Sequence, residues 1–284
     1  MPRLFSFASW NIEHFAGDQT RFDRVVRFLN QAGPPDAANE NGDSPPDVFS
    51  VQEVRSSAKV CMEFMTRMPS HQFFITIAPG SPLNILVAVN RRLTAYYEQR
   101  TELQSGMPSL RPGALVTFPI DGMNYSLLFL HLKAFDQPVG WGLRDDMIHH
   151  VRNLKKALDD VAGADARLIA MGDFNNVGLN VTFADNDMSD VEELARYDRV
   201  FASRRMSLVP KDRTGTLWNG PGSSQPPADA DHAFASDQLD IRPGATGKGL
   251  RVRGWPELAT DAEKAEWIRD FSDHALIYGE VHVS

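Results

Sequence analysis

The amino-acid sequence predicts an α/β fold. Apolar runs with the length of strands alternate along the chain with segments whose apolar residues are spaced three or four apart. Of the 284 residues, 42% are hydrophobic and 23% are charged, which is typical of a globular chain and excludes disorder, collagen and coiled coil as whole-chain structures. We find no internal repeat with a period of about 20–50 residues. We therefore expect one domain over residues 1–284, with helices outside the strands.

The expected strands are short apolar runs bounded by turn residues, and they cover residues 4–12, 48–51, 73–77, 85–89, 114–119, 125–131, 168–171, 250–253 and 275–283. The expected helices carry an apolar stripe on one face, and they cover residues 20–29, 57–67, 142–161, 190–202 and 261–271. Two turn-rich stretches, 31–46 and 215–231, bring no change of composition. We interpret them as long surface loops, which are often functional.

Charge and cysteine content exclude several classes of protein. The only cysteine is Cys61, so a disulfide scaffold and a cysteine-based zinc site are excluded. The net charge is −8, so bulk electrostatics does not favour general binding to polyanions. No apolar run approaches the roughly 20 residues of a membrane span. The first residues lack the apolar core of a signal peptide, and we expect a cytoplasmic protein without a membrane anchor.

The strongest local signal is the segment Gly172-Asp173-Phe174-Asn175, which follows the expected strand 168–171. Side chains two apart on an extended chain face the same way, so Asp173 and Asn175 could hold one water or one phosphate together. Asp, Gly and Asn are also the usual residues of turns, and a plain turn is the alternative interpretation of this segment.

Other expected strands end in similar polar groups. Asn11 and Glu13 share one face at the end of the first strand, and Glu53 follows the second. A carboxylate at such a place suits a hard cation such as Mg²⁺. His131 and Lys133, also two apart, close the strand 125–131. Two further clusters occupy residues 236–240 and 271–274. Each cluster alone is a weak signal, because a carboxylate at a strand end is often only solvated.

The pattern and order of these clusters resemble the endonuclease/exonuclease/phosphatase superfamily. This superfamily comprises metal-dependent phosphoesterases such as deoxyribonuclease I and the exonuclease III-type abasic-site endonucleases. The matching segments run from residue 10 to residue 274, and the Gly-Asp-Phe-Asn and Ser-Asp-His segments are the most specific. The resemblance implies a four-layer α/β sandwich, in which two mixed sheets pack face to face with helices outside. It also implies an active-site groove at the strand ends.

The resemblance implies a role for each cluster. It assigns Mg²⁺ or Mn²⁺ binding to acidic residues, namely Glu53, Glu13 and Asp273. It assigns catalysis to positions that orient water, phosphate and the leaving oxygen, namely His131, Asp173, Asn175 and His274, and it assigns orientation of the phosphate to Asn11. An acid should fix the tautomer of His274; Asp237 fits the family pattern best, and Asp240 is the alternative. Arg111 and Lys133 are expected phosphate contacts, since a guanidinium grips phosphate with two hydrogen bonds.

The remaining candidate residues receive structural interpretations. His71, His232 and His282 are expected at the surface. The segment Arg144-Asp145-Asp146 is interpreted as the start of the helix 142–161, where acids favour the helix dipole.

The substrate is less well defined, because the same fold and catalytic set act on many phosphoesters. The sequence has no basic run of the kind that a tight duplex binder carries. We expect a nuclease or related phosphodiesterase acting on nucleic acid, by attack of an activated water on phosphorus. A phosphatase acting on a sugar or inositol phosphate is the alternative. A non-catalytic binding protein is a remote third, since no expected catalytic position is replaced.

Overall fold

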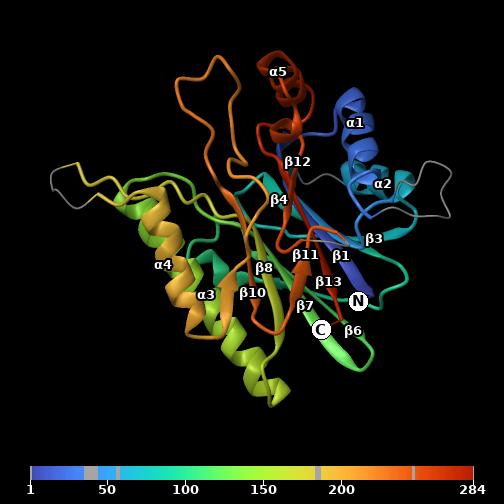
Figure 1. Ribbon diagram of the computed structural model, residues 1–284, viewed down its shortest axis with the longest axis vertical. Helices are drawn as coiled ribbons and strands as arrows, with labels where there is room; N and C mark the ends of the chain where they lie inside the picture. Colours follow the sequence, from blue (N-terminus) through green and yellow to red (C-terminus); the bar gives the residue numbers. More distant parts are fainter. Residues whose placement is uncertain (1, 35–43, 56–57, 183–186, 245–246, 284) are drawn as a thin grey trace.

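Two mixed β-sheets form the centre of the structure (Figure 1). The computed structural model describes residues 2–34, 44–55, 58–182, 187–244 and 247–283. The strands of the first sheet are β1 (Arg3–Phe15), β2 (Val48–Arg55), β3 (His71–Ile75), β4 (Leu83–Asn90), β11 (Asp240–Arg242), β12 (Arg251–Arg253) and β13 (Leu276–His282). The strands of the second sheet are β5 (Tyr96–Arg100), β6 (Gly113–Ile120), β7 (Met123–His131), β8 (Arg167–Asp173), β9 (Met206–Leu208) and β10 (Asp231–Ser236).

Each sheet contains one parallel pair. The first has the strand order β11-β13-β1-β2-β4-β3, with β12 paired to β13, and the second has the order β5-β6-β7-β8-β10-β9. β1 runs parallel to β2, and β7 runs parallel to β8. The other described pairs are antiparallel. Parallel neighbours bring their carboxyl ends to the same edge, and both parallel pairs matter for the site described below.

Helices cover the outer faces of the paired sheets. They are α1 (Gln19–Asn30), α2 (Ala58–Arg67), α3 (Pro138–Ala162), α4 (Asp190–Ala202) and α5 (Asp261–Asp270), with the short 3₁₀ turns η1 (Thr101–Gln104) and η2 (Trp255–Glu257). Figure 1 shows α3 and α4 on one side of the sheets and α1 and α2 on the other. One apolar cluster fills the space between the sheets and under α1, and a second lies between the second sheet and α3 and α4. The expected four-layer α/β sandwich is confirmed.

Local sequence explains where the helices begin. Ser189 and Glu192 form a capping box at the start of α4, and Thr260 and Glu263 form another at the start of α5. α3 begins at Pro138, earlier than expected, because proline with its fixed φ suits the first helical position. None of the helices in the described part of the chain has the length and apolar character needed to cross a bilayer.

The expected strands and helices are present; the helix 190–202 has the expected bounds, and the others begin or end at different residues. Residue 57 of the second expected helix and most of the expected loop 31–46 lie outside the described residues. Four strands were not expected: β5, β9, β10 and β11. Three of these are edge or very short strands. The fourth, β10, begins at Asp231, the last residue of the expected loop 215–231.

The expected surface positions of three histidines are wrong. His71, His232 and His282 are all buried. Each has a partner that removes the cost of burying its polar ring. His71 Nε2 lies 2.9 Å from the carbonyl oxygen of Pro46, and His282 Nε2 lies 3.0 Å from Glu280 Oε2. His232 Nε2 lies 2.8 Å from the carbonyl oxygen of Asp229.

A buried ion pair fixes the loops that follow β7 and β8. Arg144 lies inside α3 and not at its start, so its interpretation as part of the helix start is wrong. Its Nε and Nη2 donate to the two carboxylate oxygens of Glu193 on α4 at 2.9 and 3.0 Å. Its Nη1 donates to the carbonyl oxygens of Lys133 and Phe135, and its Nη2 donates to that of Gly178. Both side chains of the pair are completely buried.

Replacing Arg144 by Met should lower the free energy of unfolding by about 3–5 kcal/mol, because it leaves the Glu193 carboxylate buried without its partner. Urea denaturation of the purified protein measures this change. Arg152→Met is the matched control on the same helix, because Arg152 makes only exposed hydrogen bonds, and it should change stability by less than about 0.5 kcal/mol. Equal stabilities of the two variants would contradict the proposed importance of the pair.

Candidate active site

Polar residues from both sheets meet at one edge of the sandwich. His131 and Asp173 are direct neighbours at the ends of the parallel strands β7 and β8. In the first sheet, Asn11 of β1 lies next to Gln52 of β2, the residue before Glu53. Asn11 Nδ2 donates to Asp173 Oδ2 at 3.0 Å, which joins the two sheets at this edge. The structure therefore brings together clusters that the sequence separates by more than a hundred residues.

Asn11 holds the two central carboxylates in place. Its Nδ2 lies 3.3 Å from Glu53 Oε1 as well as 3.0 Å from Asp173 Oδ2. Its Oδ1 accepts a hydrogen bond from the backbone of Glu13 at 3.0 Å, which fixes the orientation of the amide. Glu53 Oε2 accepts from the backbone of His14 at 2.9 Å and lies 3.3 Å from His14 Nδ1. Sequence reasoning did not assign His14 to the site.

His131 faces both of these carboxylates. Its Nε2 lies 3.5 Å from Asp173 Oδ2 and 3.7 Å from Glu53 Oε1. Burial holds the pKa of His131 well below its usual value, and the nearby Arg111 adds to this effect. The ring is therefore neutral, and because Nε2 faces two acceptors we assign its proton to Nε2. Nδ1 has no hydrogen-bond partner among the described residues.

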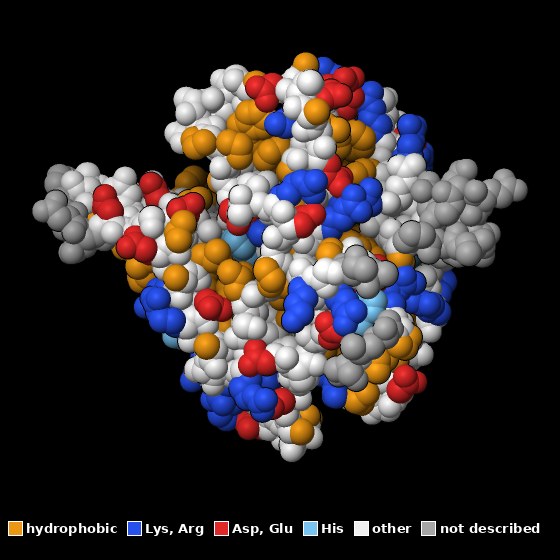
Figure 2. All heavy atoms as spheres, viewed as in Figure 1, with side chains coloured by type: hydrophobic (Ala, Val, Ile, Leu, Met, Phe, Trp, Pro, Cys, Tyr) orange, Lys and Arg blue, Asp and Glu red, His pale blue; other side chains and the backbone are white. Residues whose placement is uncertain are grey.

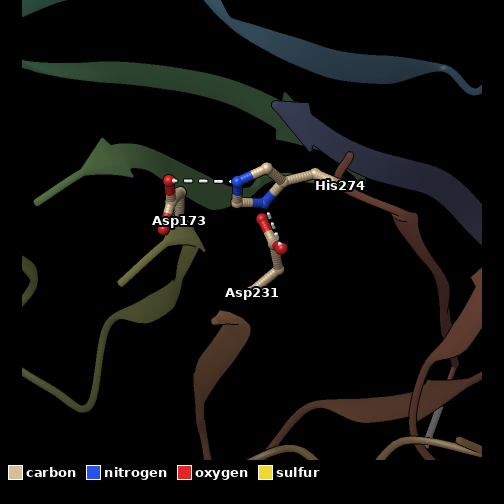
Figure 3. Close-up of side chains that lie close together, drawn as sticks. All are labelled: Asp173, Asp231 and His274. Carbon is tan, nitrogen blue, oxygen red and sulfur yellow. Dashed lines mark hydrogen bonds and ion pairs between the residues drawn. The ribbon is translucent and has the colours of Figure 1, made fainter. Parts of the chain in front are cut away.

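His274 and Asp231 form a buried pair (Figure 3). His274 Nδ1 lies 2.8 Å from Asp231 Oδ2, and its Nε2 points to Asp173 Oδ2 at 3.9 Å. Burial opposes a charge on His274, but the carboxylates of Asp231 and Asp173 outweigh it and raise the pKa of the imidazole to about 10. Burial raises the pKa of Asp173 to about 6, although the His274 charge acts in the opposite direction. The site thus pairs a stable imidazolium with a carboxylate that exchanges its proton close to neutral pH.

The expected partner of His274 is wrong. Asp237 is exposed and accepts a hydrogen bond from Ser207, and Asp240 pairs with Arg242. β10 runs antiparallel to β8, with Asp231 directly opposite Asp173, so the first residue of β10 lies at the catalytic edge. Asp237 lies beyond the other end of that strand, about 20 Å away at the usual rise per residue.

Two further carboxylates, those of Glu13 and Asp273, interact electrostatically with each other, and Asp273 also interacts with Glu53. Burial raises the pKa of Glu13, and the neighbouring charge of Asp273 raises it further. Burial also raises the pKa of Asp273, and the charge of Glu53 contributes in the same direction. Arg21 on α1 joins the end of β1, which carries Glu13, to the segment after α5, which carries Asp273, because its guanidinium donates to the carbonyl oxygens of Ile12 and Phe271. Sequence reasoning missed Arg21, which has no signal beyond its place on an ordinary helix.

Backbone strain is concentrated in these same residues. Glu13, His14, Glu53 and Asn175 have φ angles of 43°, 47°, 62° and 48°. Each costs on the order of 1–3 kcal/mol for a residue with a side chain, and such residues persist where the surrounding structure determines them. Strained residues cluster at functional sites more than elsewhere, and the strain here supports that assignment.

The loop after β8 places Asp173 and Asn175 differently from the expectation that both hold one group. Asn175 donates from its backbone to Asp173 Oδ1 at 2.9 Å, while its side-chain Nδ2 donates to the carbonyl oxygen of Leu132 at 3.2 Å. The amide therefore ties this loop to the loop after β7. Gly172 permits the close approach of the two strands, because a Cβ there would lie 2.1 Å from the carbonyl oxygen of Leu130.

Two residues were expected to contact phosphate. Arg111 lies near the two central carboxylates, and Lys133 lies at the margin of the site. Burial lowers the pKa of the Arg111 guanidinium, while the charges of Glu53 and Asp173 raise it, so it acts on both carboxylates. Its Nε has no hydrogen-bond partner among the described residues. Lys133 Nζ lies over the ring of Phe135 at 4.8 Å from its centroid.

Among the described residues, one group has its ligand atoms close enough together to hold a metal ion. Asp173, Asp231 and His274 each offer one ligand atom, and these atoms lie within 4.8 Å of one another (Figure 3). In this group, however, the short contact between His274 and Asp231 already uses the histidine Nδ1. The carboxylates that the resemblance assigns to the metal, Glu53, Glu13 and Asp273, are the kind of ligand that Mg²⁺ prefers, but they do not form a group as close as this one.

The comparisons with known proteins agree with this geometry. A family model described as the endonuclease/exonuclease/phosphatase family matches residues 8–274. The chain belongs to this family. A comparison with curated proteins finds no match.

Several solved structures share the family's fold with this chain. A truncated Caenorhabditis elegans TDP2 is similar with a TM-score of 0.61 and 16% identity, over 98% of both chains. D. rerio TDP2 complexed with a single-strand DNA product gives a TM-score of 0.58 and 16% identity, over 98% of this chain and 99% of that one. The Bacteroides thetaiotaomicron mannosyl-6-phosphatase Bt3783 gives a TM-score of 0.57 and 13% identity, over 98% of this chain and 100% of that one. At these identities the likeness concerns the fold.

Proposed function

We propose that this protein is a divalent-metal-dependent phosphoesterase that hydrolyses phosphodiester bonds in nucleic acid. One observation carries the proposal: His274, held by Asp231 at 2.8 Å, faces Asp173, and Asp173 shares Asn11 with Glu53. Hydrolysis of a phosphodiester needs neutralisation of the phosphate charge, activation of a water and stabilisation of the leaving oxygen. The residues of this edge can supply all three.

Glu53, with Glu13 and Asp273, is the proposed site for Mg²⁺ or Mn²⁺. The donor set fits a hard cation because all three ligands are carboxylates; burial, with the charges of neighbouring carboxylates, raises the pKa values of Glu13 and Asp273, and a bound cation would favour their ionised forms. A bound divalent ion supplies charge neutralisation to the phosphate and to the leaving oxygen. Arg21 and Asn11 hold the carboxylates in position for it.

Asp173 is the proposed base that orients and deprotonates the attacking water. Its pKa of about 6 leaves it mostly ionised at neutral pH and still able to accept a proton. The His274 imidazolium, fixed by Asp231, donates a hydrogen bond to a phosphate oxygen as charge develops there. Neutral His131 presents its Nε2 proton to the leaving oxygen. Asn175 connects the loop that follows Asp173 to the loop that follows His131 and so helps to fix the distance between these two residues.

Arg111 is the proposed contact to the non-bridging oxygens of the scissile phosphate. Its partly buried guanidinium lies in the field of Glu53 and Asp173, and it is suited to two parallel hydrogen bonds. Lys133 is the proposed contact to a flanking phosphate, since it lies at the margin of the group.

Nucleic acid is the proposed substrate, with a small sugar phosphate as the second candidate. The similar D. rerio TDP2 is complexed with single-strand DNA, which supports the first, and the similar mannosyl-6-phosphatase supports the second. On the face seen in Figure 2, lysine and arginine side chains are interspersed with aspartate and glutamate. With a net charge of −8 as well, a flexible single strand held at a local site is favoured over a long duplex held by bulk charge.

Removal of divalent metal should abolish hydrolysis. We expect the purified protein with Mg²⁺ or Mn²⁺ to cleave a single-stranded oligonucleotide, and EDTA to stop cleavage until excess metal is returned. Gel or chromatographic assays against plasmid, single-stranded DNA, RNA and a panel of phosphate monoesters measure both metal dependence and substrate class. Full activity in excess chelator would contradict the proposed dependence on a divalent metal. Activity on the phosphate monoesters alone would favour a sugar phosphate as the substrate.

The Mg²⁺ requirement of a Glu53 variant tests whether this residue binds the metal. Glu53→Gln should raise the Mg²⁺ concentration needed for half-maximal rate, because it removes a charged ligand. Glu266→Gln on α5 is the control, since Glu266 is exposed and its only described contact is with Arg269, and its Mg²⁺ requirement should equal that of the wild type.

A further inference from the structure

Phe135 is an exposed aromatic residue beside the catalytic edge. Its side chain is 60% exposed, and of the phenylalanines in the described residues only this one is exposed. The proposed reaction uses no aromatic group, so the chemistry of hydrolysis does not account for it. Exposure of a single apolar side chain is common. Phe135 differs in the conformation of its backbone and in the contacts that brace it.

The backbone of Phe135 is strained and braced from below. Its φ is +84°, which is rare for a bulky residue and costs on the order of 1–3 kcal/mol. Arg144 Nη1 donates to the carbonyl oxygens of Lys133 at 3.1 Å and of Phe135 at 2.5 Å. Gly140 in the first turn of α3 lies so close that a Cβ there would be 2.5 Å from the Phe135 carbonyl oxygen. A buried arginine and the start of a helix thus fix the backbone from which the exposed ring projects.

This loop is tied to the catalytic loop. The backbone of Leu132 donates to the carbonyl oxygen of Asp173 at 2.9 Å, and that of Asn180 donates to the carbonyl oxygen of Asp136 at 2.8 Å. Phe135 is four residues beyond His131, so its Cα lies within roughly 14 Å of that of His131. Phe135 therefore lies at the margin of the reacting centre.

Lys133 completes the arrangement. Its ammonium lies 4.8 Å from the centroid of the Phe135 ring, so a cation and a flat apolar face are presented together. Single-stranded nucleic acid is bound by this combination, in which a base stacks on the ring and a neighbouring phosphate contacts the cation.

We infer that Phe135 is a stacking platform for the base of a nucleotide adjacent to the scissile phosphate, with Lys133 as the partner of a flanking phosphate. The inference rests on the proposed function and narrows its substrate to an unpaired strand. Phe135 acts as a specificity-determining residue and takes no part in the chemical step.

The test compares two substrates and three variants. A fluorescent single-stranded oligonucleotide is compared with a base-free deoxyribose-phosphate strand of the same length, and both are measured for binding by anisotropy and for cleavage with Mg²⁺. Phe135→Leu keeps apolar bulk but removes the aromatic face, and Phe135→Trp keeps the face. Val139→Ala removes an exposed apolar side chain from the neighbouring first turn of α3 and serves as control.

Loss of one stacked base weakens binding by about 5- to 150-fold. We expect Phe135→Leu to weaken binding and raise KM by this factor for the oligonucleotide, with kcat and the base-free strand unchanged. Phe135→Trp and Val139→Ala should behave as the wild type. An equal effect of Phe135→Leu on both strands, or none on either, overturns the platform. Base-dependent binding that is lost in Phe135→Leu, without cleavage of any strand, supports the platform and overturns the proposed hydrolysis.

Discussion

Replacing Asp173 by Asn should lower kcat by about 10²- to 10⁴-fold, the usual contribution of a positioned general base. The amide keeps the shape of the side chain and can still accept from the Asn175 backbone through Oδ1, but it replaces Oδ2, the proton acceptor that also accepts from Asn11, with a donor. Steady-state hydrolysis of the preferred oligonucleotide at saturating Mg²⁺ measures the loss. Asp121→Asn, an exposed turn residue at the far end of β7, is the matched control and should leave kcat unchanged.

The melting temperature of Asp173→Asn distinguishes a loss of catalysis from a loss of folding. Burial raises the pKa of Asp173 to about 6, above its ordinary value, so folding disfavours the ionised form. Above that pH the charge therefore costs stability, and its removal in Asp173→Asn should offset the lost hydrogen bond from Asn11, so we expect a melting temperature close to that of the wild type. A variant that keeps more than a tenth of wild-type turnover would show that another group activates the water.

The sequence predicts the interior of this fold well because the interior follows simple rules. The central strands of the two sheets, such as β1 and β7, are long buried runs of mostly apolar residues, and such runs can be identified from sequence. β9 and β11 have only three residues each, too few for any period to appear. β5 lies at the edge of its sheet and has no fully buried residue, so it lacks the apolar pattern of a strand.

The position of Asp231 shows why the site could be predicted only in part. His131 and Asp173 come at the carboxyl ends of β7 and β8, where functional groups were expected from the sequence. β10 runs in the opposite direction, so its functional group comes at its start. A sequence does not state the direction of a strand relative to its neighbours. The signal that could have found Asp231 is the acid that precedes the apolar residues 233–235.

Arg144 shows the same limit for a long-range contact. Its neighbours Asp145 and Asp146 are common at helix starts, and local sequence therefore favoured that interpretation. The residue that determines its place is Glu193, 49 positions away on α4. Pairs of this kind depend on which helices become neighbours, which follows from the packing of layers and not from either local sequence.

Replacing Asp231 by Asn should lower kcat by about 10²- to 10⁴-fold, whereas Asp237→Asn and Asp240→Asn should leave it within about twofold of the wild type. Asp231 accepts from His274 Nδ1 at 2.8 Å, which fixes the ring orientation and supports its positive charge. An amide at this position cannot support that charge, and it can donate to Nδ1 and so favour the wrong tautomer.

The titration of His274 provides a second measurement of the same pairing. The Asp231 and Asp173 carboxylates raise the pKa of His274 to about 10, so the ring stays charged throughout the neutral range. Without the Asp231 charge the pKa should fall, and NMR of ring-labelled histidine should show deprotonation at a lower pH in Asp231→Asn than in the wild type. Asp237→Asn and Asp240→Asn should leave the titration unchanged, because both acids lie away from the ring. If Asp237→Asn instead lowers both the pKa and kcat while Asp231→Asn lowers neither, His274 takes its partner from the other end of β10.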